Sequence, residues 1–247
     1  MKSSPLVSPW PATAERKAAR DRKREAVLRM AAQVFNEKGY LAATLDEVAE
    51  RLNVTKPTLY YYVKSKDEIL YECVRIGLMM LQDAITEVGA LGGSAMDKLI
   101  TAMHKYTEIV TMDFGMCLIR VGEAPLPPES QRKLRRIKAA IDFEFRELIR
   151  LGIEEGSIVP CDPKLAAFTL AGALSWIGRW YRPGGQWTPD DIARQCTELL
   201  CNGLCAPGRS PLQIPGAVLP QATVLAPTVA KARKGSIKRV ASTPKAD

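Results

Sequence analysis

The sequence predicts an all-α protein, on the basis of three observations. Alanine and leucine are abundant, while aromatic residues make up only 6% of the chain. Apolar residues recur at intervals of three and four, as one face of a helix requires, and Ser, Thr or Asp stands where several of these patterns begin. No Asn-Gly or Asp-Gly turn separates alternating apolar runs, so β-hairpins have little support.

Residues that start and stop helices divide the amino-terminal third of the chain. A helical pattern over about residues 18–38 ends at Gly39, and glycine is favoured just beyond a helix end. Three capping residues then begin three helices, of which the middle one has Pro57 in its first turn and the last runs to about residue 89. These capping residues are Thr44, Thr55 and Ser65.

The rest of the chain is divided in the same way, at wider spacing. Gly92-Gly93, the stretch APLPPE, Gly156 and the stretch PGG interrupt its helical patterns. We therefore expect helices at residues 94–112, 128–155, 163–182 and 189–204, with a short helical piece that ends near residue 123.

The positive charge of the chain is concentrated at its two ends. Residues 1–24 carry a net charge of +5 and residues 206–247 carry +6, so the segment between them holds −3 of the total of +8. We interpret residues 1–17 as a basic disordered arm and the Pro-rich residues 206–247 as a basic disordered tail. Such arms suit a polyanionic partner, although a tail that only increases solubility explains residues 206–247 equally well. Between them we expect one domain over residues 18–65 and another over residues 66–205.

The sequence has no feature of a secreted or membrane-spanning protein. The amino terminus lacks the apolar run of a signal peptide. The longest uncharged stretch, LAAFTLAGALSWIG, is too short and too rich in small residues to span a bilayer. Six cysteines without a CxxC pair are typical of reduced thiols, so we expect a cytoplasmic protein that binds no membrane.

Metal and catalytic chemistry have little support in the sequence. The single histidine, His104, offers with Glu108 at most two ligands, so we expect no metal and no cofactor. Adjacent carboxylates occur at Glu154 and Glu155, but there is no E-x-x-H motif, Ser/His/Asp arrangement or Gly-rich phosphate loop. A helical-bundle enzyme is therefore a distant alternative, and we expect a protein that is not an enzyme.

Two short helices joined by a tight turn within residues 44–63 predict a helix-turn-helix. At about 100° per residue, Leu59 and Val63 share the buried edge of the second helix, and Tyr61 lies nearly opposite them. Tyr60 and Tyr62 flank the buried edge, so their rings can lean on the core while their hydroxyls reach outward. The residues beside Tyr61 on the exposed side are Pro57, Thr58 and Lys64.

The exposed side of this second helix suits DNA. A phenol donates to phosphate oxygens, and its ring can contact a thymine methyl group. Thr44 and Lys66 stand at the amino ends of the two neighbouring helices, where phosphates bind readily. The three consecutive tyrosines alone are equally consistent with a half-buried aromatic patch, but the helix-turn-helix pattern around them favours double-stranded DNA.

Residues 23–71 resemble the DNA-binding domain of the tetracycline-repressor (TetR) family. The matching stretch is AAQVFNEKGYLAATLDEVAERLNVTKPTLYYYVKSKDEIL, with one departure at Val63, where phenylalanine is common. The resemblance implies an all-α fold in which an N-terminal helix-turn-helix domain precedes a C-terminal helical domain for ligand binding and dimerisation. It also implies that Thr44, Tyr60 and Lys66 hold phosphates, that Lys56, Thr58 and Tyr61 lie nearest the base edges with Pro57 beside them, and that Tyr62 serves either role.

The last two helices carry stripes that suit a dimer interface. The stripe of small residues consists of Ala167, Ala171, Ser175 and Gly178, and the apolar stripe expected to face it consists of Ile192, Cys196, Leu199, Leu200 and Gly203. We expect the helices at about residues 163–182 and 189–204 of two protomers to pack as a four-helix bundle. A two-fold dimer implies a palindromic operator.

Methionines and aromatic residues within residues 66–155 suit a cavity for an elongated apolar ligand. The stretch WIGRWYRPGGQW combines aromatic faces with arginines, as an adenine and a phosphate group require. It resembles the C-terminal domain of TetR-family regulators of fatty-acid and steroid catabolism, several of which respond to acyl-CoA thioesters. The alternative is an ordinary core filled by methionine, with interface tryptophans and solvated arginines. The candidate ligand-binding residues are Met103, Tyr106, Phe114, Arg120, Phe145, Arg146, Trp176, Arg179 and Trp180.

These patterns together predict a ligand-responsive transcriptional regulator. The leading hypothesis is a repressor that binds palindromic operator DNA as a homodimer and is released by a fatty acyl-CoA or related CoA thioester. The alternative is a TetR-type repressor of an efflux or detoxification gene, induced by a drug-like or aromatic compound. A pocket richer in carboxylates than in arginines would favour that alternative.

Overall fold

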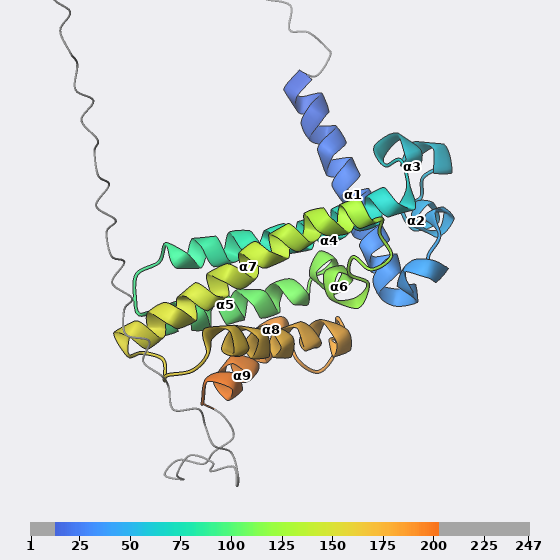
Figure 1. Ribbon diagram of the computed structural model, residues 1–247. Helices are drawn as coiled ribbons and strands as arrows, with labels where there is room; N and C mark the ends of the chain where they lie inside the picture. Colours follow the sequence, from blue (N-terminus) through green and yellow to red (C-terminus); the bar gives the residue numbers. More distant parts are fainter. Residues whose placement is uncertain (1–12, 203–247) are drawn as a thin grey trace, which may run out of the picture. The chain divides into compact units, whose positions relative to one another are not determined.

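The computed structural model describes residues 13–202, which form nine helices and no strand. Figure 1 shows the helices in chain order, coloured from blue to orange. Their bounds are α1 (Thr13–Ala42), α2 (Leu45–Arg51), α3 (Lys56–Tyr62), α4 (Lys66–Gly89), α5 (Ala95–Val110), α6 (Asp113–Arg120), α7 (Pro128–Glu155), α8 (Pro163–Trp180) and α9 (Pro189–Asn202). The all-α prediction is confirmed for this part of the chain. The remainder of the predicted arm and the whole predicted tail lie outside the described residues.

The first three helices form a small unit around a common core. The carboxyl-terminal half of α1 packs against both α2 and α3, and fully buried Val34, Phe35, Val48 and Leu59 meet there. Thr55 begins α3 as predicted, since its hydroxyl accepts a hydrogen bond from the Thr58 amide. This packing holds α3 on the outside of the unit, with one edge buried.

α1 begins earlier than the sequence pattern predicts. It starts at Thr13, so residues 13–17, which the sequence pattern places in a disordered arm, are helical. The regular helix is interrupted at Gly39, whose φ of 77° and ψ of 161° are not helical, and a short helical segment follows to Ala42. The predicted helix end at Gly39 is therefore confirmed as a break within α1, and the positive φ there favours glycine.

The remaining helices form a second unit in which α4 is the central element. α4 packs against α5, α6 and α7, while α8 packs against α5, α6 and α7 from the other side and α9 packs against α5. Figure 1 shows α4 and α7 running side by side, with α8 and α9 beneath α5. The core between them includes Leu70, Met103, Phe145, Ile149 and Leu174, all 2% exposed or less.

The small-residue stripe of α8 faces the inside of the protomer. Ala167 is buried, the Ser175 hydroxyl bonds Tyr106, and a Cβ at Gly178 would lie 3.0 Å from that of Ile119 in α6. The stripe expected at a dimer interface therefore lets α8 approach α5 and α6 closely instead.

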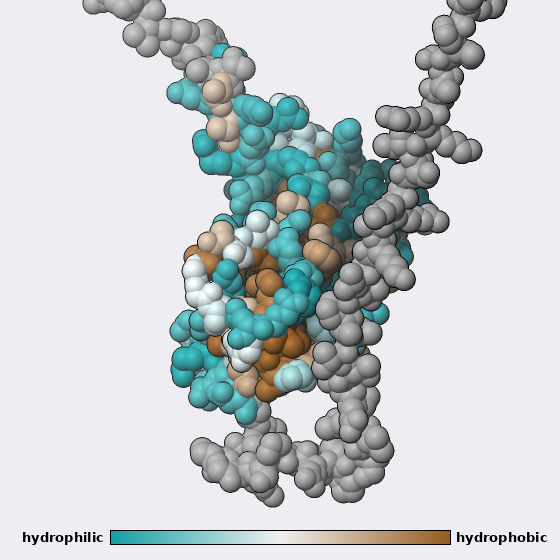
Figure 2. All heavy atoms as spheres, turned by 60° about the vertical axis from the view of Figure 1, so that its left-hand side comes forward, coloured by the Kyte–Doolittle hydropathy of each residue, from teal (hydrophilic) through white to brown (hydrophobic). Residues whose placement is uncertain are grey.

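The opposite face of α8 is apolar and exposed. Its large side chains are Leu165, Trp176 and Trp180, which recur at helical spacing. In Figure 2, hydrophobic side chains gather over the lower part of the coloured residues, whereas the upper part is mostly hydrophilic. Among the described helices, none is long and apolar enough to cross a bilayer.

Candidate DNA-binding helices and ligand cavity

α3 presents its tyrosines as the helical period predicts. Leu59 and Val63 are buried to 0% and 1% exposure, while Tyr61 is 65% exposed and Tyr60 is 45% exposed. Tyr62 is half-buried, and its ring packs edge-on against Tyr61 with 5.0 Å between centroids. The exposed phenols of Tyr60 and Tyr61 are therefore available to a partner outside the protomer.

The amino-terminal half of α1 reaches the exposed side of α3. The Arg20 guanidinium lies over the Tyr61 ring, 5.3 Å from its centroid. A cation over an aromatic face is attracted by the ring quadrupole and restrains both side chains. Sequence analysis did not identify this contact, because helical periodicity does not show which residues of separate helices meet.

Lys56 at the start of α3 is paired within the helix-turn-helix. Its ammonium lies 2.8 Å from one Asp46 carboxylate oxygen and donates to the other at 3.0 Å. This hydrogen bond raises the pKa of Lys56 above its ordinary value. Thr58 lies beside it, exposed, with its hydroxyl 2.9 Å from that of Thr55. Lys56 thus stays charged, with the Asp46 carboxylate as its partner within the protomer.

Two further predicted contacts lie at helix starts. The Thr44 hydroxyl caps α2, accepting from the Glu47 amide at 3.2 Å. Lys66, in the first turn of α4, donates to the Leu41 carbonyl at 3.4 Å, and its ammonium lies 4.4 Å from the centroid of the Tyr40 ring.

The Tyr40 hydroxyl in turn bonds the Asp67 carboxylate. Burial and this carboxylate raise the pKa of Tyr40 well above its ordinary value. The phenol therefore remains a protonated donor and fixes the ring beneath Lys66.

The amino end of α6 is fastened to α1. The Gln33 amide donates to the Asp113 carboxylate at 3.1 Å, and the Asn36 amide donates to the Asp113 carbonyl at 2.9 Å. The Arg29 guanidinium lies over the Phe114 ring, 5.2 Å from its centroid. α6 is thereby bonded directly to the helix that supports the DNA-binding unit.

The carboxyl end of α6 joins three segments through Arg120. Its guanidinium donates to the carbonyls of Gly178 at 2.8 Å, Tyr181 at 2.7 Å and Asn36 at 3.3 Å. Burial, followed by the nearby cations Arg182 and Arg179, lowers the pKa of Arg120 from its ordinary value. Cations therefore gather, with little compensation, where α6 meets the end of α8.

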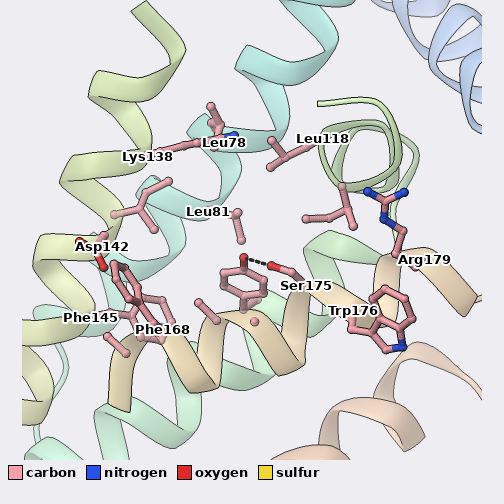
Figure 3. Close-up of a pocket in the computed structure, with 16 residues that line it drawn as sticks. Leu78, Leu81, Leu118, Lys138, Asp142, Phe145, Phe168, Ser175, Trp176 and Arg179 are labelled. Carbon is pink, nitrogen blue, oxygen red and sulfur yellow. Dashed lines mark hydrogen bonds between the residues drawn. The ribbon is translucent and has the colours of Figure 1, made fainter. Parts of the chain in front are cut away.

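A cavity of about 510 Å³ lies between α4, α5, α6, α7 and α8. Figure 3 shows its walls of leucine and aromatic side chains, and its dashed line marks the hydrogen bond that joins the hydroxyls of Ser175 and Tyr106. The lining residues are Leu78, Leu81, Tyr106, Leu118, Ile119, Lys138, Ile141, Asp142, Phe145, Ala167, Phe168, Ala171, Gly172, Ser175, Trp176 and Arg179.

Four of the predicted ligand-binding residues line this cavity, and five do not. Tyr106, Phe145, Trp176 and Arg179 are in its wall. Of the others, Met103 is fully buried in the core, Phe114 packs beneath Arg29, and Arg120 bonds the three carbonyls described above. Arg146 pairs with Asp142 and lies over Phe168, and Trp180 packs edge-on against Trp187 with 6.4 Å between centroids.

A basic groove adjoins the cavity. It has a volume of about 430 Å³ and shares Leu118, Ile119, Lys138 and Arg179 with the cavity wall. Its charged lining residues are Arg135, Lys138, Arg179 and Glu123, and Glu123 pairs with Lys138. Sequence analysis missed Arg135 and Lys138, because basic residues on an amphipathic helix usually mark its solvated face.

Two family models, one for each domain of tetracycline-repressor-type regulators, together match most of the described residues. Residues 27–73 match "Bacterial regulatory proteins, tetR family", and residues 92–204 match "Tetracyclin repressor-like, C-terminal domain". The repressor KstR2 of Rhodococcus jostii is 25% identical over 205 residues, which cover 80% of this chain and 98% of KstR2. The activator FasR of Mycolicibacterium smegmatis is 42% identical over 161 residues, covering 64% of this chain and 74% of FasR.

Solved structures share the fold. A complex of AibR with isovaleryl coenzyme A and operator DNA superposes with a TM-score of 0.64 at 23% identity, covering 72% of this chain and 97% of AibR. The helix-turn-helix with its exposed tyrosines, the helical domain behind it and these similarities lead to one conclusion. The chain belongs to the TetR family of DNA-binding transcriptional regulators.

Proposed function

We propose that the protein is a one-component regulator that binds a palindromic operator as a homodimer and releases it when a CoA thioester with an elongated acyl group binds. The observation that carries the ligand proposal is an apolar cavity that adjoins a basic groove. An apolar body in the cavity and an anionic headgroup in the groove match this pair of surfaces. The direction of control proposed is repression, as for KstR2, although the relative FasR is named an activator.

On the DNA side, the proposed contacts come from the exposed part of the helix-turn-helix. Thr44, Tyr60 and Lys66 would hold phosphates, while Lys56, Thr58 and Tyr61 would lie nearest the base edges, with Tyr62 and Pro57 beside them. The exposures of Tyr60 and Tyr61 support this assignment.

The proposed dimer interface is the exposed face of α8 together with α9. Leu165, Trp176 and Trp180 on α8 and Leu199 on α9 are each at least 39% exposed. Several large apolar side chains that are exposed on a protomer are typical of a surface that is covered in the working assembly. A two-fold axis through this face would place two copies of α3 against one palindrome.

On the ligand side, the proposed anion contacts are Arg135, Lys138 and Arg179. Arg179 forms no hydrogen bond or ion pair with any residue between 13 and 202, so a phosphate would be its first anionic partner. Three cations against Glu123 leave the groove net positive. This excess of cations favours a CoA thioester over the drug-like alternative, for which a pocket richer in carboxylates is expected.

α6 would transmit ligand binding to the DNA-binding unit. Leu118 and Ile119 contact the cavity, while the ends of the same helix are bonded to α1 through Asp113 and Arg120. A ligand that moves α6 would move α1, and with it α3. The free energy of DNA binding then weakens by the difference in ligand-binding free energy between the DNA-binding arrangement of the helices and the shifted one.

Fluorescence anisotropy with a palindromic duplex from the region upstream of the gene tests the proposal. The purified protein is titrated with decanoyl-CoA, with free CoA and with decanoyl-pantetheine, which lacks the nucleotide phosphates. Release by decanoyl-CoA at concentrations where the other two have no effect is expected. If no thioester releases the duplex, the proposed ligand is wrong. If decanoyl-pantetheine is as effective as decanoyl-CoA, the proposed phosphate groove is wrong.

A further inference from the structure

Two hydroxyl groups form a fixed polar feature in the wall of the cavity. The Tyr106 and Ser175 oxygens lie 2.7 Å apart, and both residues line the cavity (Figure 3). The Tyr106 ring packs edge-on against Phe145, with 6.0 Å between centroids, and only 7% of Tyr106 is exposed. The position of the pair is therefore set by the core rather than by solvent.

The charged side chains of the cavity wall differ from this pair in both exposure and partners. Lys138 is paired with Glu123, and its side chain is 39% exposed. Asp142 is paired with Arg146 and is 28% exposed, and Arg179 is exposed. These charged groups are therefore more exposed than Tyr106, and their charges are paired or open to solvent.

The hydrogen-bond inventory of the pair is incomplete. Two hydroxyls have two O–H donors, and the contact between them uses one. Neither oxygen makes another hydrogen bond with any residue between 13 and 202. Burial raises the pKa of Tyr106, so its hydroxyl keeps its proton at neutral pH. One O–H of the pair is thus left for an acceptor inside the cavity.

We propose that Tyr106 and Ser175 bind an acceptor oxygen carried by the apolar body of the effector, so that the preferred acyl groups bear a ketone. This inference rests on the proposed function and narrows its ligand class. A saturated chain in the same place covers the hydroxyls and leaves the spare donor unsatisfied, whereas a carbonyl oxygen accepts from it. The pair would therefore discriminate between two chains of equal length and similar shape.

Isothermal titration calorimetry on the full-length protein tests the inference with decanoyl-CoA and its oxo derivatives, in which the ketone is moved one carbon at a time along the chain. We expect one oxo isomer to bind about tenfold more tightly than decanoyl-CoA. The gain should disappear in Tyr106→Phe, which keeps the ring on Phe145, and decrease in Ser175→Ala. Tyr71→Phe, at a half-buried tyrosine outside the cavity wall, should retain it.

The possible outcomes distinguish failure of this inference from failure of the proposed CoA-thioester ligand. Wild-type protein that binds decanoyl-CoA but no oxo isomer more tightly overturns the inference and leaves the proposed ligand class intact. A gain that persists in both Tyr106→Phe and Ser175→Ala also overturns it, because the ketone would then be bound elsewhere. Failure of every thioester to bind rejects both statements.

Discussion

Arg120 in α6 donates a hydrogen bond to the backbone carbonyl of Asn36 in α1, across the boundary between the two helical units, at 3.3 Å. The same guanidinium donates to the carbonyls of Gly178 and Tyr181 at the end of α8. One side chain therefore connects the helix that supports the DNA-binding unit with a helix whose outer face is the proposed dimer interface. Backbone carbonyls make this connection independent of the side chains at the three positions.

Replacing Arg120 with methionine should weaken this junction. Arg120→Met keeps much of the side-chain volume but leaves three carbonyls without their charged donor, so we expect a loss of about 2–3 kcal/mol in the free energy of unfolding. Urea denaturation followed by circular dichroism measures the change. Arg136→Met, at an exposed arginine of α7 that pairs with no residue between 13 and 202, should change stability by less than about 0.5 kcal/mol. Equal effects of the two variants would show that Arg120 is not a structural connection.

The contact between α4 and α6 leaves no space for a methyl group at Gly77. A Cβ there would lie 2.8 Å from the Phe114 carbonyl oxygen and 3.3 Å from the Leu118 Cβ. Gly77→Ala should therefore push α6 away from α4 at a cost of about 1–3 kcal/mol. Gly89→Ala, at the end of the same helix, meets nothing within 4 Å and should be neutral or stabilising by up to about 1 kcal/mol. Thermal unfolding of the two variants measures the difference, and a neutral Gly77→Ala would show that α6 can shift freely.

Local signals in the sequence were sufficient to locate most of the helices. Thr44, Thr55, Ser65 and Ser94 each begin a helix as predicted, because a side-chain cap acts through backbone amides only a few residues away. Gly156 likewise ends α7 in the left-handed conformation. These interactions are local and therefore readable without knowledge of the fold.

The partner of the small-residue stripe on α8 and the roles of single cations could not be predicted in the same way. Small residues allow close approach to a helix of the same protomer or of another, and the closeness of Gly178 to Ile119 shows that the stripe faces α6. Arg120 was proposed as an anion partner and instead bonds carbonyls, while Arg135 reaches the basic groove. These outcomes depend on contacts between segments far apart in the chain, and periodicity carries no information on them.

Tyr61 and Lys66 should affect DNA binding in different ways. Because Lys66 is assigned to a phosphate, Lys66→Gln should weaken operator and unrelated DNA alike. It should also reduce the slope of log K against log salt by about 2 for the dimer, that is, by about 1 for each protomer. Because Tyr61 is assigned to base edges, Tyr61→Ala should lower operator affinity about tenfold with little effect on unrelated DNA. Anisotropy titrations at several salt concentrations provide both measurements. The control is Lys133→Gln on α7, which should change neither, and an unchanged operator affinity in Tyr61→Ala would contradict its assignment.

Acid should destabilise the protein partly through Glu155. The Ser157 hydroxyl and the Ala95 amide donate to its carboxylate and hold the pKa of Glu155 below its ordinary value. A depressed folded-state pKa contributes stability that is present above the unfolded-state pKa and is lost as the pH falls through the folded-state value. Glu155→Gln should therefore make the decline in unfolding free energy below about pH 5 shallower. Urea titrations at pH 7, 5 and 4 measure the decline, and Glu50→Gln, at an exposed carboxylate without a partner among residues 13–202, should leave it unchanged.

A charge on the outer face of α8 should separate the proposed dimer without unfolding the protomer. Leu165 is 66% exposed and does not line the cavity, so Leu165→Glu costs little in a monomer but would bury a carboxylate without a partner in a dimer. Sedimentation equilibrium should show a dimer for the wild type and a dissociation constant raised at least about a hundredfold for Leu165→Glu. Leu151→Glu, at a leucine of α7 that is 44% exposed, is the matched control and should remain dimeric. If both variants remain dimeric with native helicity, the interface lies elsewhere. Because two half-sites are read together, Leu165→Glu should also lose its preference for a palindrome over a single half-site.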